Sequence, residues 1–244
     1  MQASIHLSGD KAFIIRFGQA INPETLHRVK SYEAAINALQ LKGITQIIPT
    51  YCELTVCYEP AQINYKTLLD HLKQINILNT DNTTLTANTL HIPVCYNHKY
   101  GPDITTVAEK NQLSVKEVIH IHSSPRYLIY MLGFTPGFVY LGGLDKRIAT
   151  PRQAKPRTSI DAGSVGIAGN QTGVYPINSP GGWQLIGKTP LKMFDLNRQP
   201  EVLVSAGDYI KFDPVNEEQF YEIESKIKSG KYRANIKKTR STDE

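Results

Sequence analysis

The sequence has few of the residues and segments that mark secreted, disulfide-rich or membrane proteins. Its 244 residues include three cysteines, Cys52, Cys57 and Cys95, and such an odd set does not make a disulfide framework. The first residues have no basic cluster followed by an apolar run, so no signal peptide is expected. No window approaches the ~20 apolar residues of a membrane-spanning helix. Together these absences predict a cytoplasmic protein in a reducing compartment.

Histidine is missing from the stretch that is otherwise richest in unusual residues. None of the seven histidines lies between Gly133 and Asp195, which argues against a Ser-His-Asp triad built on Ser164. His120 and His122 are two potential ligands with no third ligand nearby, so no metal site is predicted. We interpret both histidines as hydrogen-bonded or solvent-exposed side chains.

Net positive charge is absent from most of the chain. The formal net charge is +5, but residues 226–244 carry seven cations against two acids, so the remaining residues are neutral overall. We expect residues 226–244 to form a basic, mobile tail. Nucleic-acid binding is not expected, because no basic face accompanies a recognisable motif.

What the sequence does contain is a concentration of glycine and proline. Residues 133–195 hold 11 of the 17 glycines, 6 of the 14 prolines and the single tryptophan, Trp183. Such a density is incompatible with long helices and suits short strands joined by tight turns. Any binding site is therefore expected in this stretch.

Upstream of it, the hydrophobic spacing predicts a small α/β domain over residues 1–78. Strands and helices are expected in the order strand, helix, strand, strand, helix, at residues 11–17, 22–41, 44–50, 53–59 and 64–75. If residues 90–96 or a neighbouring segment pair back onto this domain, the order becomes the split βαβ, or ferredoxin-like, pattern. The polar residues 79–89 are the predicted linker.

A second domain is predicted over residues 90–225. Asp103 is expected to cap a first helix, and Ser114 with Glu117 forms a capping box for the next. A buried strand is expected at residues 126–132. Two strands are expected within residues 201–212, and a last helix at residues 216–227.

A cationic segment is the first candidate for chemistry. Five cations fall within twelve residues and are spaced by two prolines: Lys146, Arg147, Arg152, Lys155 and Arg157. A charge run is usually a solvated loop. However, the prolines lower the entropy cost of ordering the loop, and guanidinium groups suit carboxylate or phosphate. Both interpretations stay open, with Arg152 and Arg157 as candidate anion contacts.

Aromatic side chains among the glycines are the second candidate. These residues are Phe134, Phe138, Tyr140, Tyr175 and Trp183. They are either core residues or a groove for a proline-containing segment or a flat ligand. In a groove, Ser164, Gln171 and Thr172 would supply hydrogen bonds. Asp161 is a candidate general base, although a turn-capping aspartate is the commoner case.

Residues 182–189 read G-W-Q-L-I-G-K-T and satisfy the pattern of a phosphate-binding P-loop. A P-loop needs a strand before it and a helix that opens at its lysine. Here S-P-G-G precedes the pattern and Pro190 follows it at once. We therefore predict a strand at this position.

Four linked motifs carry a family resemblance. They are G-F-T-P-G-F-V-Y-L from Gly133, the T-P-R and P-R pair from Thr150, A-G-S-V-G-I-A-G-N-Q-T-G-V-Y-P from Ala162, and S-P-G-G-W-Q-L-I-G-K-T-P from Ser179. With them the chain resembles, over nearly its whole length, the family of allophanate hydrolase subunit 1, the B component of bacterial 5-oxoprolinase and the sporulation kinase A inhibitor. The resemblance implies an α+β fold, with a small N-terminal domain before a cyclophilin-like β-barrel domain.

The resemblance also implies a function. Stand-alone members look like a non-autonomous subunit of an ATP-dependent complex that opens 5-oxoproline to glutamate, with a sister cyclophilin-like subunit and a third protein as partners. An anionic group of ATP or substrate would then meet Arg152 or Arg157, in a pocket shaped by Ser164, Gln171 and Tyr175. Two alternatives stay open: an inhibitor that binds a sensor histidine kinase, and a carboxyltransferase-like component of a urea carboxylase or allophanate hydrolase system. Whether this chain itself binds ATP is left open.

Overall fold

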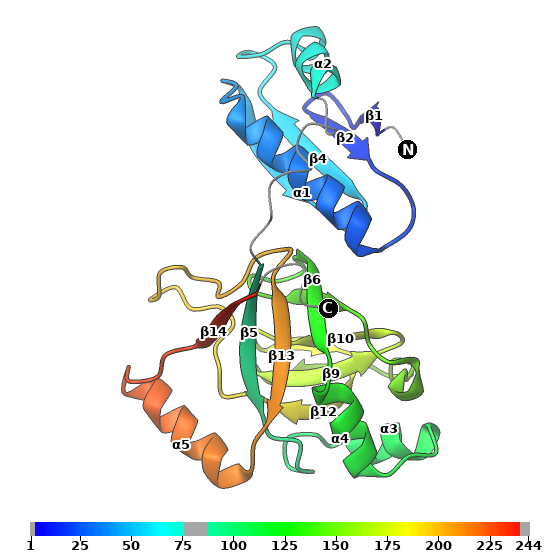
Figure 1. Cartoon of the computed structure of the whole chain (residues 1–244), viewed down its shortest axis with the longest axis vertical. Helices are drawn as coiled ribbons and strands as arrows, with labels where there is room; N and C mark the ends of the chain where they lie inside the picture. Colours follow the sequence, from blue (N-terminus) through cyan, green and yellow to red (C-terminus); the bar gives the residue numbers. More distant parts are fainter. Residues whose placement is uncertain (1–2, 76–86, 240–244) are drawn as a thin grey trace. The chain divides into compact units, whose positions relative to one another are not determined.

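The chain folds into two compact units, Met1–Leu85 and Thr86–Glu244 (Figure 1). The computed structural model describes residues 3–75 and 87–239. The predicted linker, residues 79–89, falls mostly outside the described residues, and its end from Ala87 already belongs to a strand. Among the helices of the described residues, none is both long and apolar enough to span a membrane.

The first unit is a four-stranded antiparallel sheet with two helices. The sheet order is β1-β2-β4-β3, formed by Ser4–Leu7, Ala12–Arg16, Glu53–Tyr58 and Ile44–Pro49. The helices are α1 (Pro23–Ala38) and α2 (Tyr65–Gln74). Alternate strand residues such as Phe13, Ile15 and Leu54 are buried in its core. The chain enters each helix at an asparagine cap, because Asn22 and Asn64 accept hydrogen bonds from the backbone N–H three residues ahead.

The condition for the ferredoxin-like order is not met, because residues 90–96 do not pair back onto this sheet. Their strand, β5 (Ala87–Val94), pairs with strands of the second unit. In the first unit, β1 pairs with β2 and fills the edge position that residues 90–96 were expected to take. The sequence pattern gave no signal for β1, because its residues are mostly exposed and do not alternate between buried and exposed positions.

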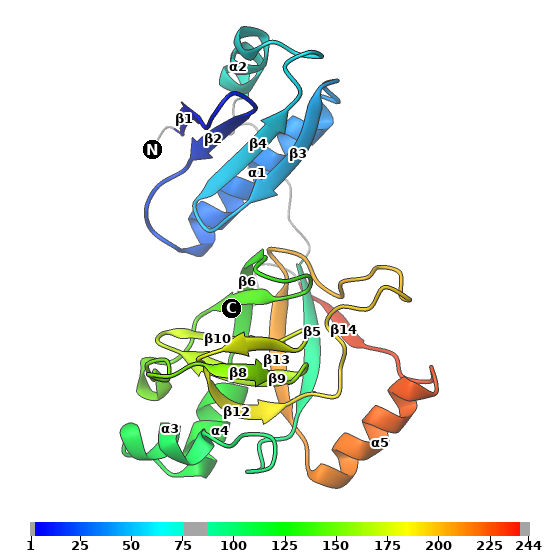
Figure 2. The same cartoon turned by 180° about the vertical axis from the view of Figure 1, so that it is seen from behind.

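The second unit is built on an eight-stranded sheet in the order β12-β9-β10-β7-β6-β13-β5-β14 (Figures 1 and 2). After β5, its strands are β6 (Arg126–Leu132), β7 (Val139–Gly142), β9 (Ser164–Ala168), β10 (Gln171–Val174), β12 (Gln184–Lys188), β13 (Tyr209–Pro214) and β14 (Asn235–Thr239). A bridge between Cys95 and Lys188 joins the end of β5 to the edge strand β12. The sheet therefore curls back on itself around one apolar core.

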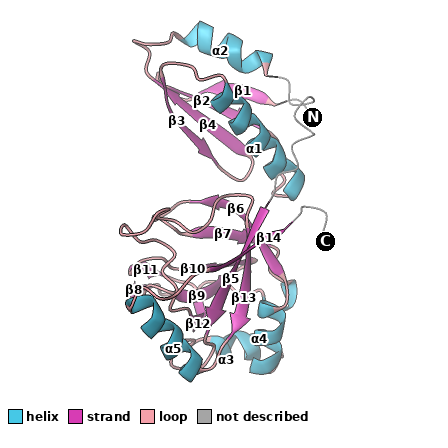
Figure 3. Cartoon of the chain, turned by 60° about the vertical axis from the view of Figure 1, so that its left-hand side comes forward, coloured by secondary structure: helices cyan, strands magenta, loops and turns pink. Residues whose placement is uncertain are grey.

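Shorter elements cover this curled sheet. The two-stranded ladder of β8 (Arg157–Ile160) and β11 (Ser179–Gly181) forms a sheet of its own (Figure 3). Helices α3 (Ile104–Lys110) and α4 (Val115–Ser123) pack on each other, with α3 next to β12 and α4 next to β13. A short 3-10 turn, η2, spans Lys146–Ile148, and α5 spans Glu217–Lys228.

Two further expectations for the second unit are wrong in part. Only one strand, β13, forms where two were expected within residues 201–212. Val202 instead forms an isolated bridge with Phe194, and the Glu201 carbonyl accepts from the Asp195 backbone N–H. The basic segment 226–244 is not wholly a tail, since it contains the end of α5 and strand β14, which pairs with β5. Exposed Lys237 and Lys238 suit an edge strand, where charge discourages pairing with another chain.

Candidate functional site

An aromatic cluster lies on the face of β9, β10 and β12 that points away from the main core. Phe138, Tyr175 and Trp183 are buried there with Ile160, Ala168 and Leu185. The Phe138 ring centroid lies 5.8 Å from that of Tyr175 and 5.7 Å from that of Trp183, in edge-to-face geometry. Tyr140 packs against the same cluster at 5.0 Å from Phe138. The aromatic residues singled out in the sequence therefore lie together, mostly as a small second core.

Glycine makes room for this cluster. A Cβ on Gly173 would lie 3.3 Å from the Trp183 indole and 3.1 Å from the Val139 carbonyl oxygen. A Cβ on Gly181 would collide with the Tyr175 hydroxyl. The glycines of this stretch thus let two large aromatic rings lie directly against backbone.

The Tyr175 hydroxyl lies close to the Gly181 backbone and is affected by the charges of two arginines. Burial raises the pKa of Tyr175, and a hydrogen bond from the Trp183 backbone works against that rise. The positive charges of Arg152 and Arg157 also lower the pKa of Tyr175. Both arginines are therefore close enough to this phenol to act on it electrostatically.

Arg157 is not a free cation. Its Nη2 donates to Asp103 Oδ1 at 2.8 Å, and its Nη1 donates to the Trp183 carbonyl at 3.4 Å. The expected capping role of Asp103 is wrong, because its side chain makes no cap hydrogen bond to α3. The carboxylate instead accepts from Arg157, from Gln153 Nε2 and from the Leu185 backbone N–H. Asp103 therefore joins the cationic loop, which we define as residues 151–157, to β12.

Arg152 differs from Arg157 in its surroundings. It is exposed, and within the part of the chain that the structure describes, no hydrogen bond or ion pair holds its guanidinium. The loop on either side of it is fixed. Gln184 Nε2 donates to the Pro151 carbonyl at 2.9 Å, and the Gln153 backbone N–H donates to the Gly182 carbonyl at 2.7 Å. Arg152 is thus a solvent-facing cation on a held backbone.

The remaining polar candidates divide between the two ends of the β9–β10 hairpin. Ser164 is buried and its carbonyl accepts from the Tyr175 backbone N–H, so both lie at one end. Asp161 is near that end, exposed, and paired with Lys188 at 2.8 Å. Gln171 pairs with Ala168 at the opposite end of the hairpin. The structure therefore places Gln171 at the opposite end of the hairpin from the Tyr175 backbone, near the turn where Gly169 bridges to Thr150.

An open depression of about 330 Å³ lies beside the aromatic cluster. It is lined by residues 132–137 and by Val202, and by none of the arginines. Phe134 on its rim is 67% exposed, has a positive φ of 67°, and contacts the Phe138 ring at 5.7 Å. A positive φ is uncommon for a bulky residue, so the turn holds Phe134 in a strained, outward position.

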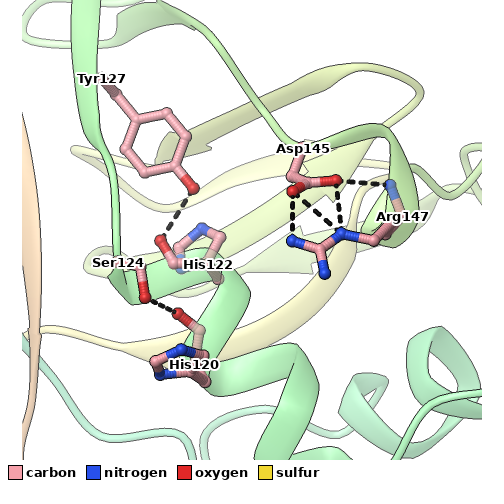
Figure 4. Close-up of polar contacts among 6 residues, drawn as sticks. All are labelled: His120, His122, Ser124, Tyr127, Asp145 and Arg147. Atoms are coloured by element: carbon pink, nitrogen blue, oxygen red, sulfur yellow. Dashed lines mark hydrogen bonds and ion pairs between the residues drawn. The ribbon is translucent and has the colours of Figure 1, made fainter.

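The two histidines of α4 are hydrogen-bonded or exposed, as predicted. His120 is exposed, and its carbonyl accepts from Ser124 Oγ at 2.5 Å (Figure 4). His122 is buried, and its ring nitrogens lie 2.8 Å from the Tyr96 hydroxyl and from Thr172 Oγ1. Its carbonyl accepts from the Tyr127 hydroxyl at 2.8 Å. Figure 4 also shows Asp145, whose pKa is held at about 2 by hydrogen bonds from Arg147. Among the described residues, no group of three or more His, Cys, Asp or Glu side chains could hold a metal ion.

The P-loop pattern at residues 182–189 is a coincidence, as the sequence indicated. Gln184–Lys188 is strand β12, and no helix opens at Lys188. The sequence did not identify Gln153 and Gln184 as residues of the site. It also did not indicate that Asp103 forms an ion pair with Arg157. These residues come from distant parts of the chain, so spacing gives no signal for their contacts. Only the position of Gln153 between two cations marks it out.

Comparisons with known proteins agree on one family. A family model described as carboxyltransferase domain, subdomain C and D, matches residues 3–204. The chain is 44% identical to the B component of 5-oxoprolinase from Bacillus subtilis (strain 168), over 87% of this chain and 93% of that protein. It is 36% identical to the corresponding 5-oxoprolinase component from Escherichia coli O157:H7, over 88% of this chain and 98% of that one.

A solved structure shows the same fold in a much longer protein. The crystal structure of Kluyveromyces lactis urea carboxylase matches with a TM-score of 0.76 at 20% identity. The match covers 97% of this chain and 24% of the urea carboxylase chain. At this identity the likeness concerns the fold.

Proposed function

Since the chain belongs to the family of 5-oxoprolinase B components, within the carboxyltransferase subdomain C and D fold, we propose that it is the B component of an ATP-dependent 5-oxoprolinase. The complex would open the cyclic amide of 5-oxoproline to glutamate, with a sister cyclophilin-like subunit and a third subunit as partners. The observation that carries this proposal is the identity to 5-oxoprolinase B components over nearly their whole length. The proposal includes a cytoplasmic complex and a cyclophilin-like β-barrel for the second unit, in keeping with the bridge that closes its sheet.

The geometry supports a binding role for this chain within the complex. The guanidinium of Arg152, which pairs with no carboxylate of the described residues, acts electrostatically on the Tyr175 phenol and suits the carboxylate of 5-oxoproline or a phosphate group. Ser164, at the same end of the hairpin as the Tyr175 backbone, is a further proposed contact, and Asp161 beside it is the proposed general base. The exposed Phe134 and the depression beside it form an apolar surface next to the cluster. We propose that a partner protein finishes the site over these residues, so that the chain is inactive alone.

ATP itself is assigned to the complex. The cationic loop fits an anionic group, but the residues that match the P-loop pattern form strand β12 and not a phosphate-binding loop before a helix. The chain's own residues therefore fit substrate carboxylate or phosphate contacts better than a dedicated nucleotide pocket.

The direct test is reconstitution. The purified chain, mixed with its two partner proteins, ATP and 5-oxoproline, is expected to release glutamate, and omission of any one component should abolish the release. Arg152→Ala is expected to raise KM about tenfold with kcat nearly unchanged, because the lost contact is made in ground state and transition state alike. Lys155→Ala, which removes another exposed cation of the same loop, is the matched control. An active complex in which Arg152→Ala behaves like this control would remove Arg152 from the site.

The carboxyltransferase-like alternative has one observation in its favour, the family model that matches residues 3–204. It predicts that the same complex carboxylates or decarboxylates a biotinylated partner. Release of glutamate from 5-oxoproline by this complex without any biotin-dependent step would favour the 5-oxoprolinase proposal over the carboxyltransferase-like alternative. Inhibition of a sensor histidine kinase stays a hypothesis, to be tested by autophosphorylation with the purified chain present.

A further inference from the structure

We propose that Asp103 is the positioning residue of the cationic loop: through Gln153 and Arg157 it holds the loop so that Arg152 faces an anionic group of the substrate. This inference rests on the proposed function, because that function gives Arg152 its substrate. It adds a residue from the start of α3, outside the glycine-rich stretch, to the working parts of the site.

The Asp103 carboxylate binds side chains of the cationic loop and the backbone of β12. Asp103 is 8% exposed, so its charge requires compensation. Its Oδ1 accepts from Arg157 Nη2 at 2.8 Å and from Gln153 Nε2 at 3.0 Å. Its Oδ2 accepts from the Leu185 backbone N–H at 2.7 Å. One carboxylate thus ties two side chains of the loop to strand β12.

The backbone of Asp103 is also hydrogen-bonded to β12. Its N–H donates to the Leu185 carbonyl at 2.9 Å, so backbone and side chain both bind the same residue of β12. This double contact fixes the carboxylate relative to the strand that follows Trp183. The loop is therefore positioned against a rigid strand, and a rigid support is what a precise binding contact needs.

Arg152 lies between two residues, Pro151 and Gln153, that are both held by hydrogen bonds. Gln184 holds the residue before it, and Gln153 after it is held by Gly182 and by Asp103. The Arg157 charge is neutralised by Asp103, whereas no carboxylate among the described residues pairs with Arg152. The arrangement leaves the Arg152 guanidinium available and fixes the backbone that carries it. Such preorganisation lowers the entropy cost of binding an anion.

The test is a double-mutant cycle in the reconstituted complex, with Asp103→Asn, Arg152→Ala and the double variant. Asn keeps the size of Asp103 but loses the charge and one acceptor oxygen. Asp103→Asn is expected to raise KM for 5-oxoproline about tenfold with kcat nearly unchanged, since it misplaces Arg152. In the Arg152→Ala background, Asp103→Asn should have no further effect on KM. Asp145→Asn, which breaks another aspartate–arginine pair of this unit, is the matched control and should leave KM unchanged.

Additive effects of Asp103→Asn and Arg152→Ala on KM would overturn the proposal, because Asp103 would then act independently of Arg152. So would an Asp103→Asn complex with the wild-type KM. If Asp103→Asn does not fold, as judged by far-UV circular dichroism, Gln153→Ala takes its place in the cycle with the same two outcomes.

Fluorescence of the single tryptophan, Trp183, tests the anchoring separately from turnover. Its carbonyl accepts from Arg157, so Asp103→Asn is expected to increase acrylamide quenching of Trp183, while Asp145→Asn does not. Unchanged quenching in Asp103→Asn contradicts the positioning role. A wild-type complex that releases no glutamate would instead refute the proposed function, whatever the fluorescence shows.

Discussion

Protonation of one buried histidine is expected to dominate the acid sensitivity of the second unit. His122 is fully buried. Its Nδ1 lies 2.8 Å from the Tyr96 hydroxyl, and its Nε2 lies 2.8 Å from Thr172 Oγ1. Thr172 donates its only hydroxyl hydrogen to the Gly166 carbonyl, so Nε2 must carry the ring hydrogen and Nδ1 must accept from Tyr96. The network is therefore complete only when the imidazole is neutral.

The size of the effect follows from the pKa. Burial lowers the pKa of His122 from 6.5 to about 3. The unfolded chain binds a proton below pH 6.5 that the folded chain refuses, so the stabilising contribution is fully present above that pH and is lost as pH falls toward 3. The full span is about 5 kcal/mol, and about 2 kcal/mol is lost by pH 5.

The assay is urea unfolding of the whole chain at pH 7.5 and pH 5, followed by the fluorescence of Trp183, which reports the second unit alone. His122→Gln is expected to be less stable at pH 7.5, because the hydrogen-bond network is disturbed. However, it should lose about 2 kcal/mol less than the wild type between the two pH values. His120→Gln, an exposed neighbour on the same helix, should keep the wild-type dependence. Equal losses in wild type and His122→Gln would refute the reasoning.

Three further substitutions test the packing and the backbone. Gly181→Ala is expected to displace the Tyr175 hydroxyl and to cost about 1–3 kcal/mol of unfolding free energy; an unchanged urea midpoint would contradict the close contact. Phe134→Gly should raise stability by up to about 1 kcal/mol by relieving the positive φ, and a loss of stability would show that the contact with Phe138 outweighs the strain. Asn22→Ala removes the cap of α1 and should cost about 1 kcal/mol in the first unit, measured by circular dichroism at the helix band; no change would mean that water replaces the cap.

Local signals in the sequence were sufficient wherever the physical cause was local. The asparagine cap at Asn22 and the capping box at Ser114 depend on residues three apart, and the helices begin where these residues indicate. The predicted strand at residues 126–132 is confirmed. Its signal is also local, because a continuous apolar run can be identified in the sequence without knowing which strand it pairs with. Strands β1 and β14 lack such a run, and they form because a neighbouring strand offers its backbone.

The same division between local and long-range signals applies to the residues of the site. The cluster of Phe138, Tyr175 and Trp183 follows from the composition of one stretch. The role of Asp103 does not, because a residue whose position indicates a helix cap can use its carboxylate to bind Arg157 and Leu185 instead. Pairing across such distances in the chain depends on strand register, which no spacing rule supplies. Conversely, residues close in the sequence can lie apart in the structure. Gln171 is in the same motif as Tyr175 but lies at the other end of the hairpin.

The place of β5 in the second unit has a consequence for the order in which the molecule can assemble on the ribosome. The strands of the first unit are all synthesised by Tyr58, so its sheet can form early. Strand β5 emerges at Ala87, but its sheet neighbours β13 and β14 begin only at Tyr209 and Asn235. Until they emerge, β5 has unpaired backbone on both sides, which invites association with another nascent chain. A chain shortened before β13 is therefore expected to aggregate, even though the glycine-rich stretch is complete.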